Sequence, residues 1–437
     1  MGTQKPAQVS PFRPGVGKEP PEPYVGRQAE LDAFGKLLRE LHYNPRNMTL
    51  LGLRGVGKSV VSKHFLKLAT DQKVVAVRRE IAPSFTVQEE FEAMVLSDAE
   101  TAFERLSAIH RISETARRSL PALVQVIGAS LHVALSQPGL PLDVGFTLAP
   151  DPDIVTRGRP FVDRLTALYR KIGEVARDQG RGVVLVIDEA QAARCPDPRM
   201  GTLSQLLQAV SQVQEDNLPV ALVLVGLPPV RQILTDASSH AERFLAGSLE
   251  VGALPPEEAL VALEEPARRS GLPFEPGVAQ QVAEDCQNYP YFIQAFGDGV
   301  WNFAHDAGLP SIRAEDYAAS LPALRAGLDA TFYGPRYGRI TANIERLVLS
   351  AMGAEEGDVV ARSALVQRLG GVVRANMVDR TLLALIDHDV VMREGWGQLR
   401  FTAPGYGRYL SRQHPIASEL RAYRTRSRSE REVELGR

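Results

Sequence analysis

The chain has 437 residues, of which 44% are hydrophobic and 23% charged, a balance that predicts a globular protein of two or three domains. The formal net charge of −2 is uneven: residues 337–437 hold 16 Arg against 12 Asp and Glu, a net of +4, which leaves −6 for the first 336 residues. A region of this size and charge permits contact with nucleic acid without requiring it.

Cysteine usage and the N-terminal sequence favour a cytoplasmic protein. The two cysteines, Cys195 and Cys286, form neither a metal-spaced pair nor a disulfide framework, which suits a reducing compartment. The first ten residues lack the apolar segment of a signal peptide, and Pro6 breaks the myristoylation pattern. No apolar run approaches the roughly 20 residues that span a bilayer. We therefore expect no membrane partner.

In chain order, the sequence divides into five segments. Residues 1–23 contain six prolines, which block helix and sheet ladders and predict an extended arm. Residues 24–253 alternate apolar runs with helical patterns, which predicts a doubly wound parallel sheet of the α/β class. The remaining segments are expected to be an all-helical domain, a third compact unit and a solvated Arg-rich tail: 254–330, 331–412 and 413–437.

After a first helix that ends near Leu41, the sequence predicts seven further elements in the α/β region. The predicted strands are Asn47–Leu51, Lys73–Ile81, Gly182–Ile187 and Val220–Val225, and the predicted helices are Lys58–Thr70, Phe161–Ala176 and Gly201–Val213. Strand–helix–strand steps of about 30 residues each do not fill the interval before Phe161, so an insertion is expected at about 82–160.

The insertion begins with two helical patterns, Val87–Leu96 and Glu100–Ile109. Further on, apolar residues alternate on both sides of Pro138-Gly139, which predicts a β-hairpin. Neither pattern carries a recognisable chemistry.

A glycine-rich loop follows the first predicted strand. Gly52–Ser59 matches G-x-x-x-x-G-K-[ST], with a strand before it and a helix after it. Its glycines let the backbone N–H groups turn inward toward an anion, and the helix start adds its positive dipole end. Lys58 is expected to contact the outer phosphates and Ser59 to hold Mg²⁺. The expected nucleotide-binding residues of the loop are Gly52, Arg54, Gly55, Val56, Gly57, Lys58, Ser59 and Val60.

An acidic pair, Asp188-Glu189, ends the third predicted strand. A carboxylate there lies at the C-terminal edge of the sheet, where open α/β sheets bind ligands. We expect Asp188 to hold Mg²⁺ through water and Glu189, with Lys58, to act in catalysis by polarising the attacking water. Alone, the pair is equally typical of a solvated loop. Together with the glycine-rich loop, it predicts that the chain binds ATP with Mg²⁺ and hydrolyses it.

The ordered set of motifs resembles STAND ATPases and their AAA+ relatives. The matching segments are Tyr24–Leu31 for "hhGRExEL", Ile187–Gln191 for Walker B, Val225–Pro228 for the end of the fourth strand, Ala241–Phe244 for the segment after it, and Asn288–Phe292 for the lid motif "GYPYF". From Tyr24 to Arg412 the chain is similar to bacterial AAA-family ATP-binding proteins of the archaeal-ATPase and origin-recognition kind. The resemblance implies a P-loop core, a helical lid at 254–330 and a C-terminal winged helix.

The resemblance also implies roles for single residues. Gly26 and Arg27 would lie near the base and phosphates, and Pro290 would lie over the adenine. Arg243 would either reach a neighbouring molecule's phosphate as a catalytic finger or form a surface salt bridge. Gly226 stands where many relatives have a polar sensor, and no Arg stands at 294–297. Both departures favour a nucleotide-controlled switch over an assembled ring motor.

The third unit predicts three helices and a β-hairpin, which resembles a winged helix. The expected elements are helices Asn343–Met352, Ser363–Leu369 and Ala375–Ile386 and strands Val390–Arg393 and Gln398–Thr402. The third helix is the one that enters the major groove in helix-turn-helix proteins. Its inward residues are expected to be Met377, Leu382, Leu383 and Ile386.

Candidate DNA contacts of this unit are Arg374, Asn376, Arg380, Arg393 and Arg400, whereas Asp379, Asp387 and Asp389 would repel phosphate. Two hypotheses therefore stay open. In the first, the nucleotide state controls binding of the winged helix to double-stranded DNA. In the second, the chain is a slow regulatory switch whose partner is a protein or a second copy of itself.

Overall fold

The computed structural model describes residues 9–15, 24–81, 88–109, 160–193, 201–355, 357 and 359–435. The predicted β-hairpin around Pro138 and most of the proline-rich arm lie outside these residues. Two compact units are present. The sheet unit consists of Arg27–Gly52 and Lys58–Val251, and the helical unit consists of Met1–Gly26, Leu53–Gly57 and Gly252–Arg437.

A five-stranded parallel sheet in the order β2-β3-β4-β1-β5 forms the centre of the sheet unit. Its strands are β1 (Met48–Leu51), β2 (Val75–Glu80), β3 (Val183–Asp188), β4 (Val220–Gly226) and β5 (Ser248–Glu250). β3 and β4 are buried along their whole length, as expected of strands covered on both faces. The doubly wound parallel sheet is confirmed. β5 was not predicted, because it has only three residues and none of them is fully buried.

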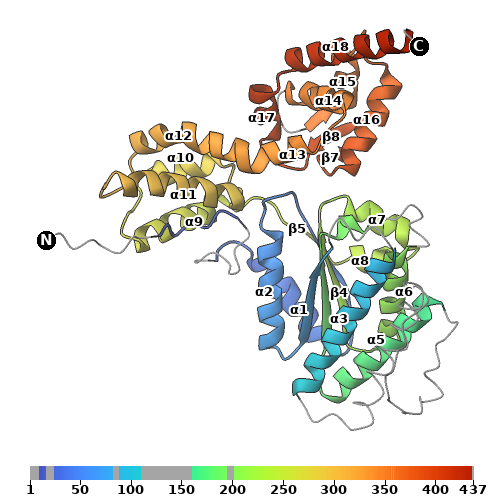
Figure 1. The fold of residues 1–437 in the computed structure, drawn as a ribbon. Helices are drawn as coiled ribbons and strands as arrows, with labels where there is room; N and C mark the ends of the chain where they lie inside the picture. The colour runs from blue at the N-terminus through green and yellow to red at the C-terminus, as the bar shows by residue number, and fades with distance from the viewer. Residues whose placement is uncertain are drawn as a thin grey trace, which may run out of the picture. The chain divides into compact units, whose positions relative to one another are not determined.

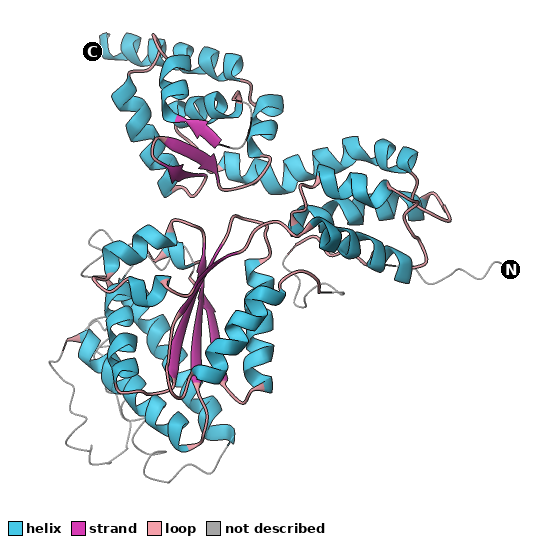
Figure 2. Cartoon of the chain, turned by 180° about the vertical axis from the view of Figure 1, so that it is seen from behind, coloured by secondary structure: helices cyan, strands magenta, loops and turns pink. Residues whose placement is uncertain are grey.

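Helices cover both faces of this sheet. α1 (Gln28–Glu40) and α2 (Lys58–Asp71) lie on one face, and α3 (Gln88–Ile109), α5 (Phe161–Asp178) and α6 (Thr202–Glu215) lie on the other (Figure 1), with the strands between the two helix layers (Figure 2). Two short helices, α7 (Val230–Ala237) and α8 (Glu242–Leu245), join β4 to β5. Connections that move in opposite directions along a parallel sheet place their helices on opposite faces.

The start of the expected insertion is one helix, so the prediction of two helices is wrong. α3 runs unbroken from Gln88 to Ile109, and its apolar side chains belong to the same core as β2 and α5. Asp98, which lies between the two predicted helices, is only 5% exposed and accepts a hydrogen bond from Arg79 Nε at 2.8 Å. Asp98 therefore stays inside the helix because a neighbouring arginine satisfies it.

The first part of the helical unit is all-helical, as expected of a lid. It contains α9 (Pro256–Arg269), α10 (Val278–Asp285), α11 (Pro290–Asp306), α12 (Ala314–Leu328), the π-helical turn η3 (Asp329–Tyr333) and α13 (Gly334–Gly338). Phe12 from the N-terminal arm is buried against Gly297 of α11, where an added Cβ would lie 2.5 Å from its ring. Position 297 therefore accommodates only glycine while Phe12 packs there.

The C-terminal domain has the predicted three helices and hairpin, plus further elements. Its helices are α14 (Asn343–Gly353), α15 (Arg362–Arg368), α16 (Ala375–Asp387), α17 (Tyr406–Gln413) and α18 (Ile416–Leu435). β6 (Val359–Ala361), which was not predicted, pairs with β8 (Gln398–Phe401), and β8 pairs with β7 (Val391–Gly395), so the antiparallel sheet has three strands.

Two expectations for this domain are wrong. On α16, Met377 and Leu383 are 38% and 49% exposed, and the core-facing stripe is Val378, Leu382 and Leu385, at spacings of four and three. The segment expected to be a solvated tail is helical in α18, which packs apolar side chains such as Leu420 against the core. No helix in the described part of the chain is long and apolar enough to span a membrane.

Candidate nucleotide site

The glycine-rich loop lies between β1 and α2. Gly55 and Gly57 have φ angles of +86° and +90°, a region that residues with a Cβ rarely adopt. The Lys58 side chain turns back across the loop, and its Nζ donates a hydrogen bond to Gly52 O at 2.9 Å. Because Lys58 is only 7% exposed, its ammonium group is held at the mouth of the loop and not in bulk water.

Asp188 lies at the carboxyl end of β3 and is almost fully buried, at 1% exposure. Its carboxylate accepts a hydrogen bond from Arg78 Nη2 at 2.5 Å and another from the Glu189 backbone N–H at 2.9 Å. Arg78 comes from β2, the neighbouring strand, and its Nε donates to Ser62 Oγ of α2 at 3.0 Å. One guanidinium group therefore neutralises Asp188 and connects it to the helix that carries Ser59.

These oxygen donors fit a magnesium ion. Mg²⁺ prefers carboxylate, hydroxyl and water oxygens, and Asp188 and Ser59 provide the first two. Asp188 is a buried carboxylate whose charge must be matched by a cation, and Arg78 supplies one positive charge there. The residues therefore fit the metal that accompanies a nucleoside triphosphate.

Glu189 follows Asp188 with a left-handed backbone, φ +55° and ψ +38°. Its side-chain carboxylate accepts a hydrogen bond from Gln191 Nε2. Gln191 belongs to the short turn η2 (Ala190–Ala192) and is 2% exposed, and its Oε1 accepts from the Leu227 backbone N–H at 3.0 Å. The acid at 189 is thus connected to the residue that follows β4.

Within the helical unit, several loop residues make further contacts. The Arg54 backbone N–H donates to Thr402 O at 3.1 Å, and its guanidinium lies 3.9 Å from Asp389. The Tyr291 N–H donates to Gly55 O at 3.1 Å. A Cβ built on Gly57 would lie 3.9 Å from Pro290, the first residue of α11. Residues of the lid and of the C-terminal domain therefore contact the loop segment.

The two residues expected near the base have local partners. Gly26 has φ +59°, and a Cβ there would lie 2.3 Å from Glu258 Oε2, so the position favours glycine. The Arg27 guanidinium is buried and lies 3.5 Å from Glu30 of α1. Contacts to a base remain a prediction for both.

Arg243 lies on α8, just before β5 begins. Because β1 and β5 are parallel, this is the amino-terminal edge of the sheet, whereas the loop follows the carboxyl end of β1. The Arg243 guanidinium forms an ion pair with Glu215 Oε1 at 2.7 Å. Arg243 therefore cannot serve the phosphate site of its own chain, and a role in a neighbouring chain stays a prediction.

The candidate DNA-contacting residues differ in how they are paired. Arg374, Arg380 and Arg393 have no carboxylate partner among the described residues, whereas Arg400 pairs with Glu394 at 3.0 Å. Asn376 is exposed at the start of α16. The carboxylate of Asp379, expected to repel phosphate, is neutralised by Arg362, whose hydrogen bonds hold the pKa of that carboxyl below its usual value.

Sequence reasoning missed three polar residues of the site. Arg78 was not singled out because its importance depends on β2 lying next to β3, which the sequence does not state. Ser62 is recognisable only through Arg78. Gln191 stands inside the Walker B segment, so its place in a motif was the available signal, but its partner Leu227 is distant in sequence.

Comparisons with known proteins agree with this geometry. Residues 23–225 match the AAA ATPase domain family, and residues 330–410 match a domain of unknown function, DUF8462. No curated protein matches the sequence. Among solved structures, a Walker-type ATPase of Pyrococcus abyssi superposes with a TM-score of 0.56 at 17% identity, over 88% of this chain and 96% of that one.

A second structure, the ORC2 protein of Aeropyrum pernix in ADPNP–ADP complexes, superposes with a TM-score of 0.49 at 15% identity, over 92% of this chain and 97% of that one. At 17% identity, the similarity to the Pyrococcus protein concerns the fold. The family match covers the glycine-rich loop, both acidic residues of the site and all strands of the sheet except the last residue of β4 and the short β5. Residues 23–225, a little under half of the chain, are therefore similar to the AAA ATPase domain family.

Proposed function

We propose that this chain binds ATP with Mg²⁺ at the loop Gly52–Ser59 and hydrolyses it to ADP and phosphate. The observation that carries the proposal is the buried polar arrangement at the carboxyl edge of the sheet. The nearly buried Lys58 spans the loop. The nearly buried Asp188 ends β3, and Arg78 matches its charge. Buried charges of both signs are costly unless a partner satisfies them.

In this proposal each residue has a separate role. The loop N–H groups and Lys58 bind the β- and γ-phosphates, while Ser59 and Asp188 hold Mg²⁺. Bound Mg²⁺ supplies positive charge that stabilises the phosphate oxygens. Glu189 orients the attacking water and accepts its proton. As the water oxygen bonds to the γ-phosphorus, the bond to the β–γ bridging oxygen breaks and its electron pair stays on ADP.

We further propose that the nucleotide state is coupled to the C-terminal domain. Support comes from the Arg54 backbone N–H, which belongs to the phosphate-binding loop but donates to Thr402 O, next to β8. A phosphate that takes this N–H removes the hydrogen bond to Thr402. ATP binding and this contact with the C-terminal domain therefore compete for one donor.

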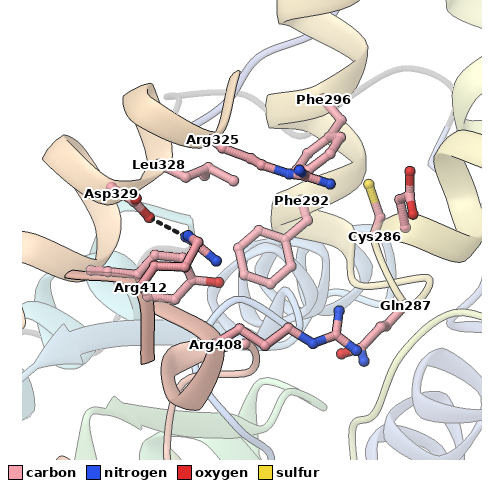
Figure 3. A pocket seen from close by; sticks show the side chains of 12 residues that line it. Cys286, Gln287, Phe292, Phe296, Arg325, Leu328, Asp329, Arg408 and Arg412 are labelled. Atoms are coloured by element: carbon pink, nitrogen blue, oxygen red, sulfur yellow. Dashed lines mark hydrogen bonds and ion pairs between the residues drawn. The ribbon is translucent and has the colours of Figure 1, made fainter. Parts of the chain in front are cut away.

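Contacts between the lid and the C-terminal domain provide a route for that coupling. Asp329, in the π-helical turn after the lid, forms an ion pair with Arg412 of α17 at 2.8 Å. Figure 3 shows this pair beside the Phe292 ring, in a hollow of about 150 Å³ that both domains line. Tyr333 Oη also donates to Pro404 O at 2.9 Å. A shift of one domain therefore has to rearrange contacts of the other.

Two partners remain candidates for the C-terminal domain. Double-stranded DNA is favoured by Arg374, Arg380 and Arg393, which are exposed and have no carboxylate partner in the described part of the chain. A protein partner is favoured by the hollow of about 580 Å³ between α16 and the β7–β8 hairpin, which is lined by Leu382, Leu383, Ile386 and the fully exposed Trp396. Exposed apolar side chains such as Leu383 and Trp396 mark protein interaction sites more often than phosphate contacts.

Phosphate release tests the proposed reaction. Wild-type protein should release phosphate from ATP, and Glu189→Gln should lower kcat by about 10²–10⁴-fold, the usual contribution of a general base, while ATP affinity is kept. Glu174→Gln, an exposed change on α5, is the control and should leave kcat unchanged. Normal phosphate release by Glu189→Gln would remove Glu189 from the role of base.

A duplex titration with and without ATP, at two salt concentrations, distinguishes the partners. If arginine–phosphate contacts carry binding, the affinity falls steeply with salt. Bound duplex should also shield Trp396 from a soluble quencher, whereas Trp301 is buried in either state. Weak binding that does not change with salt would eliminate DNA and leave the protein partner.

A further inference from the structure

Gln191 makes two hydrogen bonds that connect the proposed catalytic acid to the neighbouring strand. Its Nε2 donates to the Glu189 carboxylate, and its Oε1 accepts from the Leu227 backbone N–H at 3.0 Å. At 2% exposure, the amide cannot exchange these partners for bulk water. A buried side-chain amide satisfied at both ends has a fixed orientation, so it also fixes the groups that it contacts.

Gly226 provides the space that this arrangement needs. A Cβ built at Gly226 would lie 2.6 Å from Gln191 Oε1 and 2.6 Å from Val230 Cγ2, closer than real Cβ contacts. The backbone of Gly226 is ordinary strand, so its φ angle does not call for glycine. The absence of a side chain at the end of β4 is therefore explained by the Gln191 amide that occupies the position.

The backbone at Glu189 supports the same conclusion. Glu189 has φ +55°, which is uncommon for a residue with a Cβ and has an energetic cost of about 1 kcal/mol or more. The turn that follows is short, with Ala192 N donating to Glu189 O at 2.8 Å. This conformation returns the chain so that residues 189 and 191 meet side chain to side chain.

We propose that Gln191 is a positioning residue for hydrolysis: it holds the Glu189 carboxylate in place and ties it to the end of β4 through Leu227. This inference rests on the proposed ATPase activity and adds a residue to it. In this proposal Gln191 contacts Glu189 and Leu227, and it has no direct role toward the water or the phosphate. It acts only through Glu189, so its loss affects turnover and not nucleotide binding.

Three variants separate the two hydrogen bonds. Gln191→Met keeps the length of the side chain and removes both bonds. Gln191→Glu keeps an acceptor for Leu227 N–H but replaces the donor to Glu189 with a second carboxylate oxygen. Gly226→Ala leaves Gln191 unchanged and displaces its amide. Misplacement of a catalytic group by about 1 Å costs on the order of 10²-fold in rate, so each variant should lower kcat by about 10–100-fold.

The experiment measures ATP affinity by titration and phosphate release at saturating ATP for each variant. Thr166→Val is the control, because Thr166 is also a buried donor to a glutamine, Gln212, but lies at the α5–α6 contact. We expect ATP affinity within about threefold of wild type for all variants, and an unchanged kcat for the control. A variant that does not fold is recognised by lost ATP affinity, and the remaining two then carry the test.

Combination with Glu189→Gln tests whether Gln191 acts through Glu189. Residues that act as a unit are not additive, so Gln191→Met should cause no further loss of kcat in the Glu189→Gln background. An equal loss in both backgrounds, or a normal kcat in folded Gln191→Met, would overturn the inference alone. Absence of phosphate release by the wild type would instead overturn the proposed activity, and the inference with it.

Discussion

The cluster around Asp188 and the arginines of the C-terminal domain use the same residue types in opposite surroundings. In the sheet unit, Asp188 is 1% exposed and Arg78 provides its charge partner. In the C-terminal domain, Arg374, Arg380 and Arg393 face solvent without a carboxylate partner among the described residues. A charge without a partner is costly only where water is excluded.

This difference explains why the partner of Asp188 can be identified from the structure, whereas the partner of the exposed arginines cannot. A buried charge has to be paired by the chain itself, so the structure identifies Arg78 as the partner of Asp188. An exposed arginine is satisfied by water, so its position is compatible with a phosphate, a carboxylate or no partner.

Lys58→Ala should produce the largest change. The loop then loses the buried ammonium group that is expected to contact the outer phosphates, and we expect ATP affinity to fall by about 100-fold or more. Lys67→Ala, an exposed lysine on the same helix, is the matched control and should bind ATP normally. Calorimetric titration measures both, and unchanged ATP affinity of Lys58→Ala would refute the assignment of the loop.

Arg78→Met should destabilise the protein by about 3 kcal/mol, because Asp188 is left buried without a cation. Adding Mg²⁺ with ATP should restore part of this loss, since the metal supplies the missing charge. Urea unfolding with and without Mg-ATP measures both effects. Arg231→Met removes an exposed pair with Glu250 and should cost about 1 kcal/mol or less. Equal costs for the two variants would contradict the contrast between buried and exposed pairs.

If the C-terminal domain binds DNA, Arg380→Ala should weaken duplex binding more than Arg400→Ala. Arg380 has no carboxylate partner among the described residues, whereas Arg400 is paired with Glu394 and has less to gain from a phosphate. Loss of one phosphate contact should lower the slope of affinity against salt by about 1. Fluorescence anisotropy at several salt concentrations measures that slope, and identical slopes for both variants would mean that ion pairing does not select the contacting residues.

The smallest effect concerns pH. Burial lowers the pKa of His414 below its ordinary value of 6.5, with Glu419 acting in the opposite direction, and its ring stacks on Tyr337 at 3.6 Å. The unfolded chain therefore takes up a proton first as the pH falls below about 6.5, and the folded state loses stability in that window. The melting temperature should fall less between pH 7.5 and 5.5 in His414→Gln than in the wild type. An equal fall would exclude His414 as the cause.

Local motifs predicted much of the sheet unit. The glycine-rich loop and the strand that ends in Asp188 were predictable because the chemistry needs fixed residue types at fixed spacing. Apolar runs also gave β3 and β4 to within one residue at each end, since both faces of these strands are covered. The parallel arrangement of the strands, though not their order, followed from the alternation of strands and helices.

Other features depend on tertiary packing that the sequence does not state. The pairing of Arg78 with Asp188 needs the strand order, and the role of Gln191 needs the approach of β4. On α16 several apolar residues fit more than one helical stripe, and the packing selected Val378 over Met377. The continuity of α3 depended on Arg79, which satisfies Asp98 inside the core.

The most direct test is a titration of the wild-type protein with ATP, with and without Mg²⁺. The arrangement of Lys58, Ser59 and Asp188 predicts saturable binding of one nucleotide per chain that is tighter when Mg²⁺ is present. No measurable affinity for ATP or ADP in the presence of Mg²⁺ would contradict the assignment of the site, and with it the proposed reaction and the role of Gln191.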